Sequence, residues 1–405
     1  MSSTDREQKK SRRPPTVLGS SGFGAGLSAD VSGASGSNNA AAAFHQVANA
    51  SKQLDRYFQS LDGEGARFAK ILEQSRWREK AAACSNSSFE DCSLAEATLE
   101  QSHCQLVRLA AVSAVKVYAK EATKDLVPDE FSVFSIPANI NAESLGGSVK
   151  ATNIWLYIPN DSTSGSTNVI VVAIRGSVTY HDWLVNLNNG GGRPVQDPFL
   201  GVDEVGTPYS AHPGFLECAK AMKTKVFELI HQFCSNNFAA EVRSKPTLLF
   251  TGHSAGGAVA AMLYTHLLNC DPVLDDIHMS AALKTAFGAV HCITFGAPPI
   301  TTKPLLPSQA GSLLLSIIND GDPVPRADKE YIDALLRLFS NDMPEEGTKY
   351  VLPPRVFFNA GAEIITLVDG RLLRPSEFGK GSLAETLMGD KRAHSMLEYR
   401  RRLEL

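Results

Sequence analysis

The pentapeptide GHSAG at residues 252–256 constrains this chain more than any other segment. It follows a short apolar run, TLLFT at 247–251, that is typical of a buried strand. It leads into residues 256–268, which open with small side chains and are typical of a helix. A serine at such a tight strand-to-helix turn leaves no room for side chains two positions before and after it, which explains Gly252 and Gly256. The pattern therefore predicts that Ser254 is a nucleophile held at a strained turn.

The start of the predicted helix supports the same interpretation. Gly257 and Ala258 would let the helix lie close to the sheet. The unpaired amides and the positive dipole end at a helix N-terminus stabilise an anion that forms beside the nucleophile. A glycine-rich turn with an idle serine would not need strand, pentapeptide and helix to coincide, so the sequence favours chemistry at Ser254.

Short apolar runs alternate with longer amphipathic segments over most of the chain. The apolar runs have the length of strands, and the amphipathic segments repeat their apolar residues at helical spacing. This alternation predicts an α/β fold with a mainly parallel central sheet that helices cover on both faces. The predicted strands are 151–158, 168–174, 247–251, 291–295, 313–318, 356–359 and 363–369, and the predicted helices include 106–118, 214–234 and 256–268.

The composition divides the chain into three parts. Residues 1–40 are rich in Ser, Gly and Asn with little to bury, so we expect a disordered N-terminal tail. Residues 41–92 are predicted to form a helical N-terminal arm, because apolar residues recur there at three- and four-residue steps as far as about residue 80. Such an arm must pack on its own domain or on a partner protein. Residues 93–405 are predicted to be one catalytic domain.

Charge and hydropathy argue against several classes of function. The formal net charge of −4 offers no basic surface for nucleic acid and no broad attraction to anionic membranes. No window reaches the ~18 apolar residues that cross a bilayer, and no apolar run of signal-peptide length follows the basic start of the chain. We therefore expect a cytoplasmic protein.

The seven cysteines contain no C-x-x-C pair, so we expect no structural zinc site. Most of these thiols are expected to be small buried groups. A disulfide between Cys84 and either Cys92 or Cys104 stays open for the case that the chain is exported.

Four motifs give the chain a resemblance to a known family. They are IRGS at 174–177, GHSAG at 252–256, NDGDPVPR at 319–326 and AHSMLEY at 393–399, with looser matches in AHPGF at 211–215 and FGAP at 295–298. Through them the chain resembles the class 3 lipases, the fungal triacylglycerol lipase-like family, from about residue 100 to about residue 400. The resemblance implies the α/β-hydrolase fold. The family usually continues F-G-x-P with R-V-G, and Pro299-Ile300-Thr301 stands there instead, which leaves the acyl or head-group preference open.

The resemblance also implies an oxyanion hole built by two loops. In the family the serine after R-G contributes its backbone amide and hydroxyl, and Ser177 matches that position. The backbone amide of Ala255 is the second donor that the resemblance implies. Two preorganised donors from different loops are what a tetrahedral oxyanion requires.

A base and an acid should follow the nucleophile, because the order in this fold is serine, acid, histidine. Of the ten histidines only His394 comes after His291, which lies on a predicted strand, and His394 matches the family segment H-S-M-x-x-Y. Two aspartates compete for the acid. Asp320 follows an asparagine as the family acid does, but the family pattern N-D-x-V-P fits the distance from Asp322 to Val324. We predict Asp322 as the acid and Asp320 as a turn or capping residue.

Residues 180–189 are predicted to form a mobile apolar lid. Tyr180, Trp183, Leu184 and Leu187 fall on one face of a short helix directly after Ser177, and a run of three glycines follows at 190–192. Such a stripe is usually core packing. The region corresponds to the lid of related lipases, however, and an apolar flap beside an oxyanion loop suits a lipid-facing enzyme.

These observations predict a serine hydrolase of carboxylic esters, most simply a lipase that cleaves acylglycerols through Ser254, Asp322, His394 and an acyl-enzyme. We expect a lipid or ester substrate, transient contact with a lipid surface, no nucleic acid, and neither metal nor organic cofactor. The N-terminal arm is available for protein contacts. Two alternatives stay open: a non-lipid esterase or phospholipase on the same scaffold, and a binding or scaffold protein that keeps the triad.

Overall fold

A computed structural model describes residues 76–90, 92–118, 128–143, 149–160, 167–176, 193–237, 245–269, 277–307, 309 and 311–404. These residues all belong to one compact unit, residues 47–405. The predicted tail at 1–40 and most of the predicted arm lie outside the described residues, so both stay predictions. In the described ranges, no helix combines the length and the apolar character that a membrane crossing requires.

An eight-stranded sheet organises this unit, in the order β1-β2-β3-β6-β7-β8-β9-β10. The five strands from β3 to β9 are parallel to their neighbours, whereas β1, β2 and β10 pair antiparallel at the two edges. The strands are β1 Phe131–Glu143, β2 Val149–Pro159, β3 Val169–Ile174, β6 Thr247–His253, β7 Ala289–Phe295, β8 Leu314–Asn319, β9 Ala362–Thr366 and β10 Leu372–Leu373, with β4 Val195–Gln196 and β5 Ser210–Ala211 in a small second sheet.

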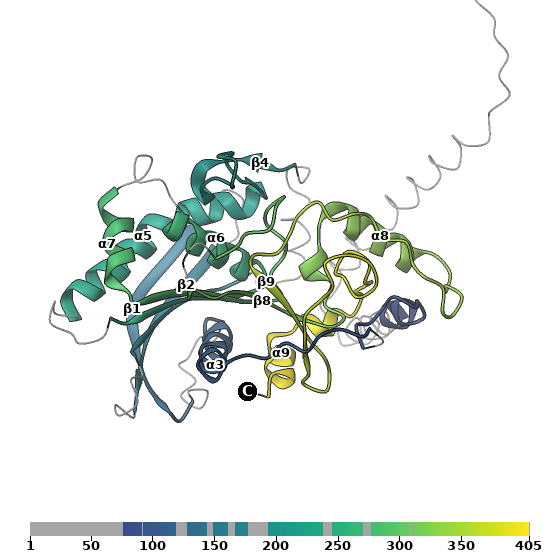
Figure 1. Cartoon of the computed structure of the whole chain (residues 1–405), viewed down its shortest axis with the longest axis horizontal. Coiled ribbons are helices and arrows are strands. Elements are labelled where there is room, and N and C mark those ends of the chain that lie inside the picture. The colour runs from purple at the N-terminus through teal and green to yellow at the C-terminus, as the bar shows by residue number, and fades with distance from the viewer. Residues whose placement is uncertain are drawn as a thin grey trace, which may run out of the picture. The chain divides into compact units, whose positions relative to one another are not determined.

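Helices cover both faces of the large sheet. In Figure 1, α5, α6 and α7 lie on one face, and α3 and α9 lie on the other. The helices are α3 Gln101–Lys116, α5 Pro213–Asn237, α6 Ala255–Asn269, α7 Ile277–Ala286, α8 Lys329–Ser340 and α9 Met396–Arg402, with short 3-10 turns η2 Pro198–Leu200, η3 Val324–Arg326 and η4 Lys391–His394. This is the α/β-hydrolase architecture that the sequence predicts.

Strand β3 is apolar throughout because both of its faces are buried. In β3, Ile170 and Val172 pack under α5 and α6, whereas Val169 and Val171 pack against the layer of α3 and α9. Successive side chains of a strand point to opposite faces, so a strand between two helix layers buries both sets of side chains and favours apolar residues at most positions. Every residue of β3 and β6 is buried accordingly.

One predicted strand, 356–359, is wrong. Phe358 forms an isolated bridge to Thr301, the next bridge, to Leu305, is made by Ala360 outside the segment, and the segment joins no sheet. Its apolar residues suit a strand, but the edge of β8 is already occupied by β9, and Pro353 and Pro354 directly before it interrupt regular pairing. The other predicted strands are confirmed with small shifts of their ends.

Residues 76–90, the described end of the predicted arm, pack on the same unit as the sheet. Lys80 Nζ donates to the carbonyl oxygens of Phe339, at 2.8 Å, and of Asn341, and so satisfies acceptors at the end of α8. Trp77 stacks on Phe339 with ring centroids 4.6 Å apart.

Cys84 and Cys104 are free thiols, so neither of the two disulfides considered above forms.

Phe89 makes this segment part of the core, since its side chain is fully buried among Ile318, Ile365 and Leu367. We expect Phe89→Ala to lower the free energy of unfolding by ~3–5 kcal/mol, because it removes a large buried ring and leaves a cavity. Phe378, which is 81% exposed, is the matched control. Phe378→Ala should change the free energy by less than ~0.5 kcal/mol in urea titrations. Equal effects of both substitutions would mean that segment 76–90 does not hold the core together.

Candidate active site

Ser254 occupies a strained turn between two regular elements. Strand β6 ends at His253 and helix α6 begins at Ala255, and Ser254 between them has a φ of 57°. Glu404 is the one other non-glycine residue with positive φ in the described part of the chain. Such a conformation costs about 1–3 kcal/mol and persists where the surroundings enforce it. Here the Ser254 amide donates to the carbonyl oxygen of Phe295 at 3.0 Å, which ties the turn to β7.

The glycines of the pentapeptide are required by backbone contacts. A Cβ at Gly252 would lie 2.5 Å from the carbonyl carbon of Gly256. A Cβ at Gly256 would lie 2.1 Å from the carbonyl oxygen of Ile174, at the end of β3. Both distances are shorter than any real van der Waals contact, so neither position accepts a side chain. The strand-to-helix turn predicted from the sequence thus has the crowded geometry that its glycines implied.

The end of β3 lies against the first turn of α6. A Cβ at Gly176 would lie 3.3 Å from the backbone nitrogen of Gly256. Next to this contact, the Ala255 amide is in the first turn of α6, where amide groups have no acceptor within the helix. Ser177, the other predicted oxyanion residue, lies outside the described residues, and so do the predicted lid residues Tyr180, Trp183, Leu184 and Leu187.

The structure brings His394 and Asp322 together. His394 Nδ1 lies 2.9 Å from Oδ2 of Asp322 and 3.1 Å from its Oδ1. The Asp322 side chain is fully buried, and that of His394 is 15% exposed. The carboxylate also accepts from the backbone amide of Val324, at 2.9 Å, and from the hydroxyl of Tyr399, at 2.7 Å. These donors fix the carboxylate in one orientation toward the imidazole.

Asp320 faces a different part of the molecule. Its carboxylate accepts from the Ser88 hydroxyl at 2.8 Å and from the Phe89 amide at 3.3 Å, so it anchors the segment before α3. Burial raises the pKa of Asp320, and the two hydrogen bonds and the charge of Arg402 oppose that shift. Of the two aspartates that competed in the sequence, Asp322 is the one in contact with His394.

Gly296 makes room for this pair. It follows β7 with a φ of 54°, and a Cβ there would lie 2.7 Å from Asp322 Oδ2 and 3.1 Å from His394 Nδ1. Any side chain would therefore enter the space between carboxylate and imidazole. The carbonyl oxygen of Phe295, the residue before it, accepts the Ser254 amide, so these two residues join the turn of Ser254 to the Asp322–His394 pair.

The ring of His253, the residue before Ser254, contacts the backbone of His394, a role that the sequence does not suggest. Its Nε2 lies 2.7 Å from the backbone oxygen of His394, and since a carbonyl oxygen only accepts, Nε2 carries the proton. Its Nδ1 then accepts from the Tyr118 hydroxyl at 3.4 Å, and that hydroxyl accepts from the Gly176 amide at 3.0 Å. Burial, together with the nearby charge of His394, lowers the pKa of His253 to about 3, so this ring stays neutral beside His394.

Tyr399 is a further residue to which the sequence assigned no role, although it stands in the HSMxxY match. Its hydroxyl donates to Asp322 and accepts from the backbone amide of Asn319 at 3.0 Å. Burial, followed by the charge of Asp322, raises the pKa of Tyr399 well above its ordinary value, so the phenol remains a donor. Among the described residues, no cluster of three or more His, Cys, Asp or Glu side chains is arranged to bind a metal ion.

Part of the chain is similar to known proteins. Residues 171–331 match the family model described as Lipase (class 3). The secreted mono- and diacylglycerol lipase 1 of Fusarium solani is 30% identical over 118 residues, which are 29% of this chain and 29% of that protein. The similarity therefore spans less than a third of that relative's length.

Several solved lipase structures are similar at low identity. The Rhizomucor miehei lipase propeptide complex is 15% identical, with a TM-score of 0.45, over 74% of this chain and 81% of that one. Lip2 lipase of Yarrowia lipolytica is 12% identical, with a TM-score of 0.44, over 74% and 93%. The fold assignment itself rests on the strand order and the two helix layers described above. Residues 171–331, which run from β3 past Ser254 and Asp322 into α8, are thus similar to the class 3 lipases.

Proposed function

We propose that this chain hydrolyses carboxylic esters with Ser254 as nucleophile, His394 as general base and Asp322 as the acid that orients the base. The observation that carries the proposal is the buried Asp322–His394 pair, joined through Gly296 and Phe295 to the strained turn of Ser254. A serine hydrolase combines a nucleophile, a base and a group that orients the base. Ser254 follows β6, Asp322 follows β8, and His394 is the last residue of η4.

The proposed reaction begins with attack of Ser254 Oγ on the ester carbonyl carbon. His394 takes the hydroxyl proton on Nε2, because Nδ1 is directed to Asp322. The charge that develops on the imidazole is stabilised by the Asp322 carboxylate, which protein atoms shield from water. The carbonyl electrons move onto oxygen and form the tetrahedral oxyanion.

The oxyanion is expected beside the N-terminus of α6, where the Ala255 amide is a donor and the helix dipole favours negative charge. Ser177 is proposed as the second donor on the family pattern. Collapse of the intermediate expels the alcohol, which takes the proton from His394, and leaves the acyl-enzyme. Water then attacks the acyl group with His394 again as base, and Ser254 is released.

The proposed substrates are acylglycerols. The family model is one of lipases, and the relative from Fusarium solani is named as a mono- and diacylglycerol lipase. A non-lipid esterase on the same scaffold would use the same three residues, so the substrate class needs its own measurement.

Ser254 is expected to be the one residue labelled by a fluorophosphonate probe. The probe should modify the tryptic peptide that contains residues 252–256, and Ser254→Ala should abolish both labelling and ester turnover, because it removes the hydroxyl that His394 is proposed to activate. Labelling that survives Ser254→Ala would move the nucleophile elsewhere in the chain.

Asp322→Asn should reduce kcat by up to about ten-thousandfold, because an amide no longer holds the imidazole in the productive tautomer. Asp320→Asn is the matched control two residues away. It should keep most of its turnover, since an amide oxygen can still accept from Ser88 and Phe89. Initial rates on a soluble ester measure both, and the opposite ranking would give the acid role to Asp320.

Emulsified long-chain acylglycerols should be hydrolysed faster than short soluble esters at equal ester concentration if the enzyme is a lipase. The measurement is a pH-stat titration across acyl chain lengths with Ser254→Ala as the blank. Turnover restricted to soluble short-chain esters would assign the chain to the esterases instead, with the same triad.

A further inference from the structure

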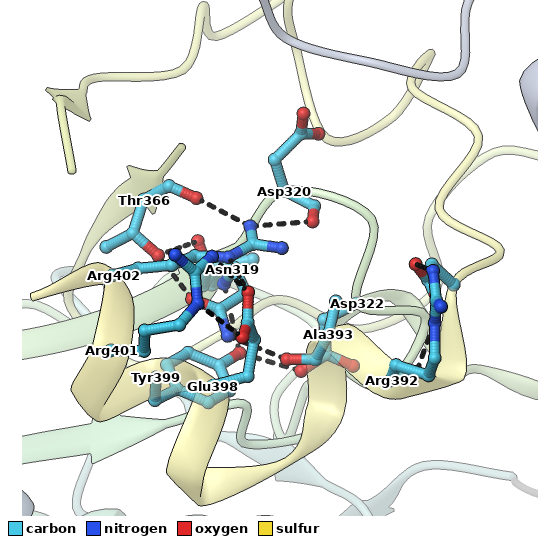
Figure 2. A network of polar contacts seen from close by, with 12 residues as sticks. Asn319, Asp320, Asp322, Thr366, Arg392, Ala393, Glu398, Tyr399, Arg401 and Arg402 are labelled. Carbon is cyan, nitrogen blue, oxygen red and sulfur yellow. Dashed lines mark hydrogen bonds and ion pairs between the residues drawn. The ribbon is translucent and has the colours of Figure 1, made fainter. Parts of the chain in front are cut away.

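The C-terminal helix α9 is fastened to the loop that carries the proposed acid. We call residues 319–322, which begin at the last residue of β8, the acid loop. Figure 2 shows α9 side chains converging on it from one side, with Tyr399 and Arg402 directed to the loop. These two residues are three positions apart and therefore share one face of the helix.

Arg402 binds two backbone carbonyls, one in the acid loop and one at the end of β9. Its guanidinium NH1 donates to the carbonyl oxygen of Asp320 at 2.9 Å and to that of Thr366 at 3.0 Å. Asp320 is in the acid loop after β8, and Thr366 is the last residue of β9. The Asp320 amide also donates to the Thr366 carbonyl, at 2.9 Å. Arg402 thus connects the acid loop to the end of β9, at the point where this loop leaves the sheet.

Burial and a further hydrogen bond to Glu398 restrict the Arg402 guanidinium to this position. Arg402 is 5% exposed, and its Nε donates to Glu398 Oε1 at 2.8 Å, one turn earlier in α9. Burial raises the pKa of the neighbouring Asp320 carboxyl group, and the positive charge of Arg402 acts against that rise. An arginine suits this position because its planar fork can reach an acceptor on the helix and two on the sheet together.

The same helix face reaches Asp322 through Tyr399. The Tyr399 hydroxyl donates to the Asp322 carboxylate at 2.7 Å and accepts the Asn319 amide from the start of the acid loop. The Asn319 side chain in turn donates to the carbonyl of Ala393, directly before His394, at 2.7 Å. A shift of α9 relative to the acid loop would therefore disturb the acid and the base at once (Figure 2).

We propose that Arg402 is a positioning residue: it fixes the register between α9 and the acid loop, and so holds Asp322 at hydrogen-bond distance from His394. This inference rests on the proposed function of those two residues. Arg402 itself does not touch substrate. It acts through the Asp320 carbonyl on one side and through the placement of Tyr399 on the other.

Arg401 provides a matched control in the same helix. It is also bonded to Glu398, at 2.7 and 2.8 Å, but its side chain is 54% exposed. Removing the Arg401 guanidinium takes away a positive charge and an ion pair of α9, as removal of Arg402 does. It leaves the carbonyls of Asp320 and Thr366 with their donor.

The test compares Arg402→Met, Arg402→Lys and Arg401→Met by kcat and KM on a soluble ester and by the rate of fluorophosphonate labelling of Ser254. Arg402→Met should lower kcat and the labelling rate about ten- to hundredfold with KM little changed, because a misplacement of about 1 Å at a catalytic group costs as much as about a hundredfold in rate. Arg402→Lys, which keeps the charge and reaches one carbonyl, should fall between Arg402→Met and the wild type. Arg401→Met should match the wild type.

The proposal is overturned if Arg402→Met keeps the wild-type kcat, if Arg401→Met loses as much as Arg402→Met, or if the loss appears in KM alone. Should Arg402→Met fail to fold, Arg402→Lys decides at a temperature where circular dichroism shows it folded: wild-type kcat and labelling rate would then reject a positioning role. Ser254→Ala, measured in parallel, distinguishes failure of the proposed function from failure of the inference about Arg402. Activity that persists in Ser254→Ala rejects the proposed function, whereas an inactive Ser254→Ala with an active Arg402→Met rejects only the inference about Arg402.

Discussion

The buried carboxylate of Asp322 is the constraint on which the site depends. An unpaired charge inside a protein costs several kcal/mol, so a carboxylate with no exposed surface must be surrounded by donors. Here the donors are the Val324 amide, two residues along the chain, and the side chains of His394 and Tyr399 from the C-terminal segment. Folding that satisfies this charge therefore also places the imidazole and docks α9. A glycine is needed at position 296 for the same reason, because a side chain there would occupy the space in which His394 and Tyr399 contact the Asp322 carboxylate.

The strain at Ser254 is tolerated because its surroundings are rigid. Strand β6 is buried along its whole length between β3 and β7, and α6 is packed on it through Gly256 and Gly257. The positive φ of Ser254 persists because relaxing it would break that packing. The neighbouring His253 then uses its neutral ring to hold the backbone of His394, so that the strained turn and the base are connected by residue 253 as well as by residues 295 and 296.

Residues outside the segment that matches the family model also contribute to the candidate site. The match ends at residue 331, whereas His394, Tyr399 and Arg402 follow it and Ser88 and Phe89 precede it. Asp320 accepts from the preceding segment and, through its carbonyl, from Arg402 of the following one. The acid loop is thereby held from two ends of the chain. Its environment depends on contacts between residues more than 200 positions apart, such as Ser88 and Asp320.

The sequence by itself determined what depends on neighbouring residues: the strand-turn-helix around Ser254, the apolar strands of a doubly covered sheet, and His394 as the histidine in the right chain order. The first two follow from local sterics and from periodicity, whereas the prediction of His394 follows from the order of the groups in the family that the chain resembles. It favoured Asp322 over Asp320 through a spacing, but only the tertiary structure shows which carboxylate meets the imidazole. Gly321, with a φ of 90°, turns the chain between the two aspartates. The tertiary structure alone assigned 356–359 to a loop, because β9 occupies the edge of β8, and it alone gave roles to His253, Tyr399 and Arg402. Their spacing carries no such information, since each acts on atoms that only the folding of distant segments brings within hydrogen-bond reach.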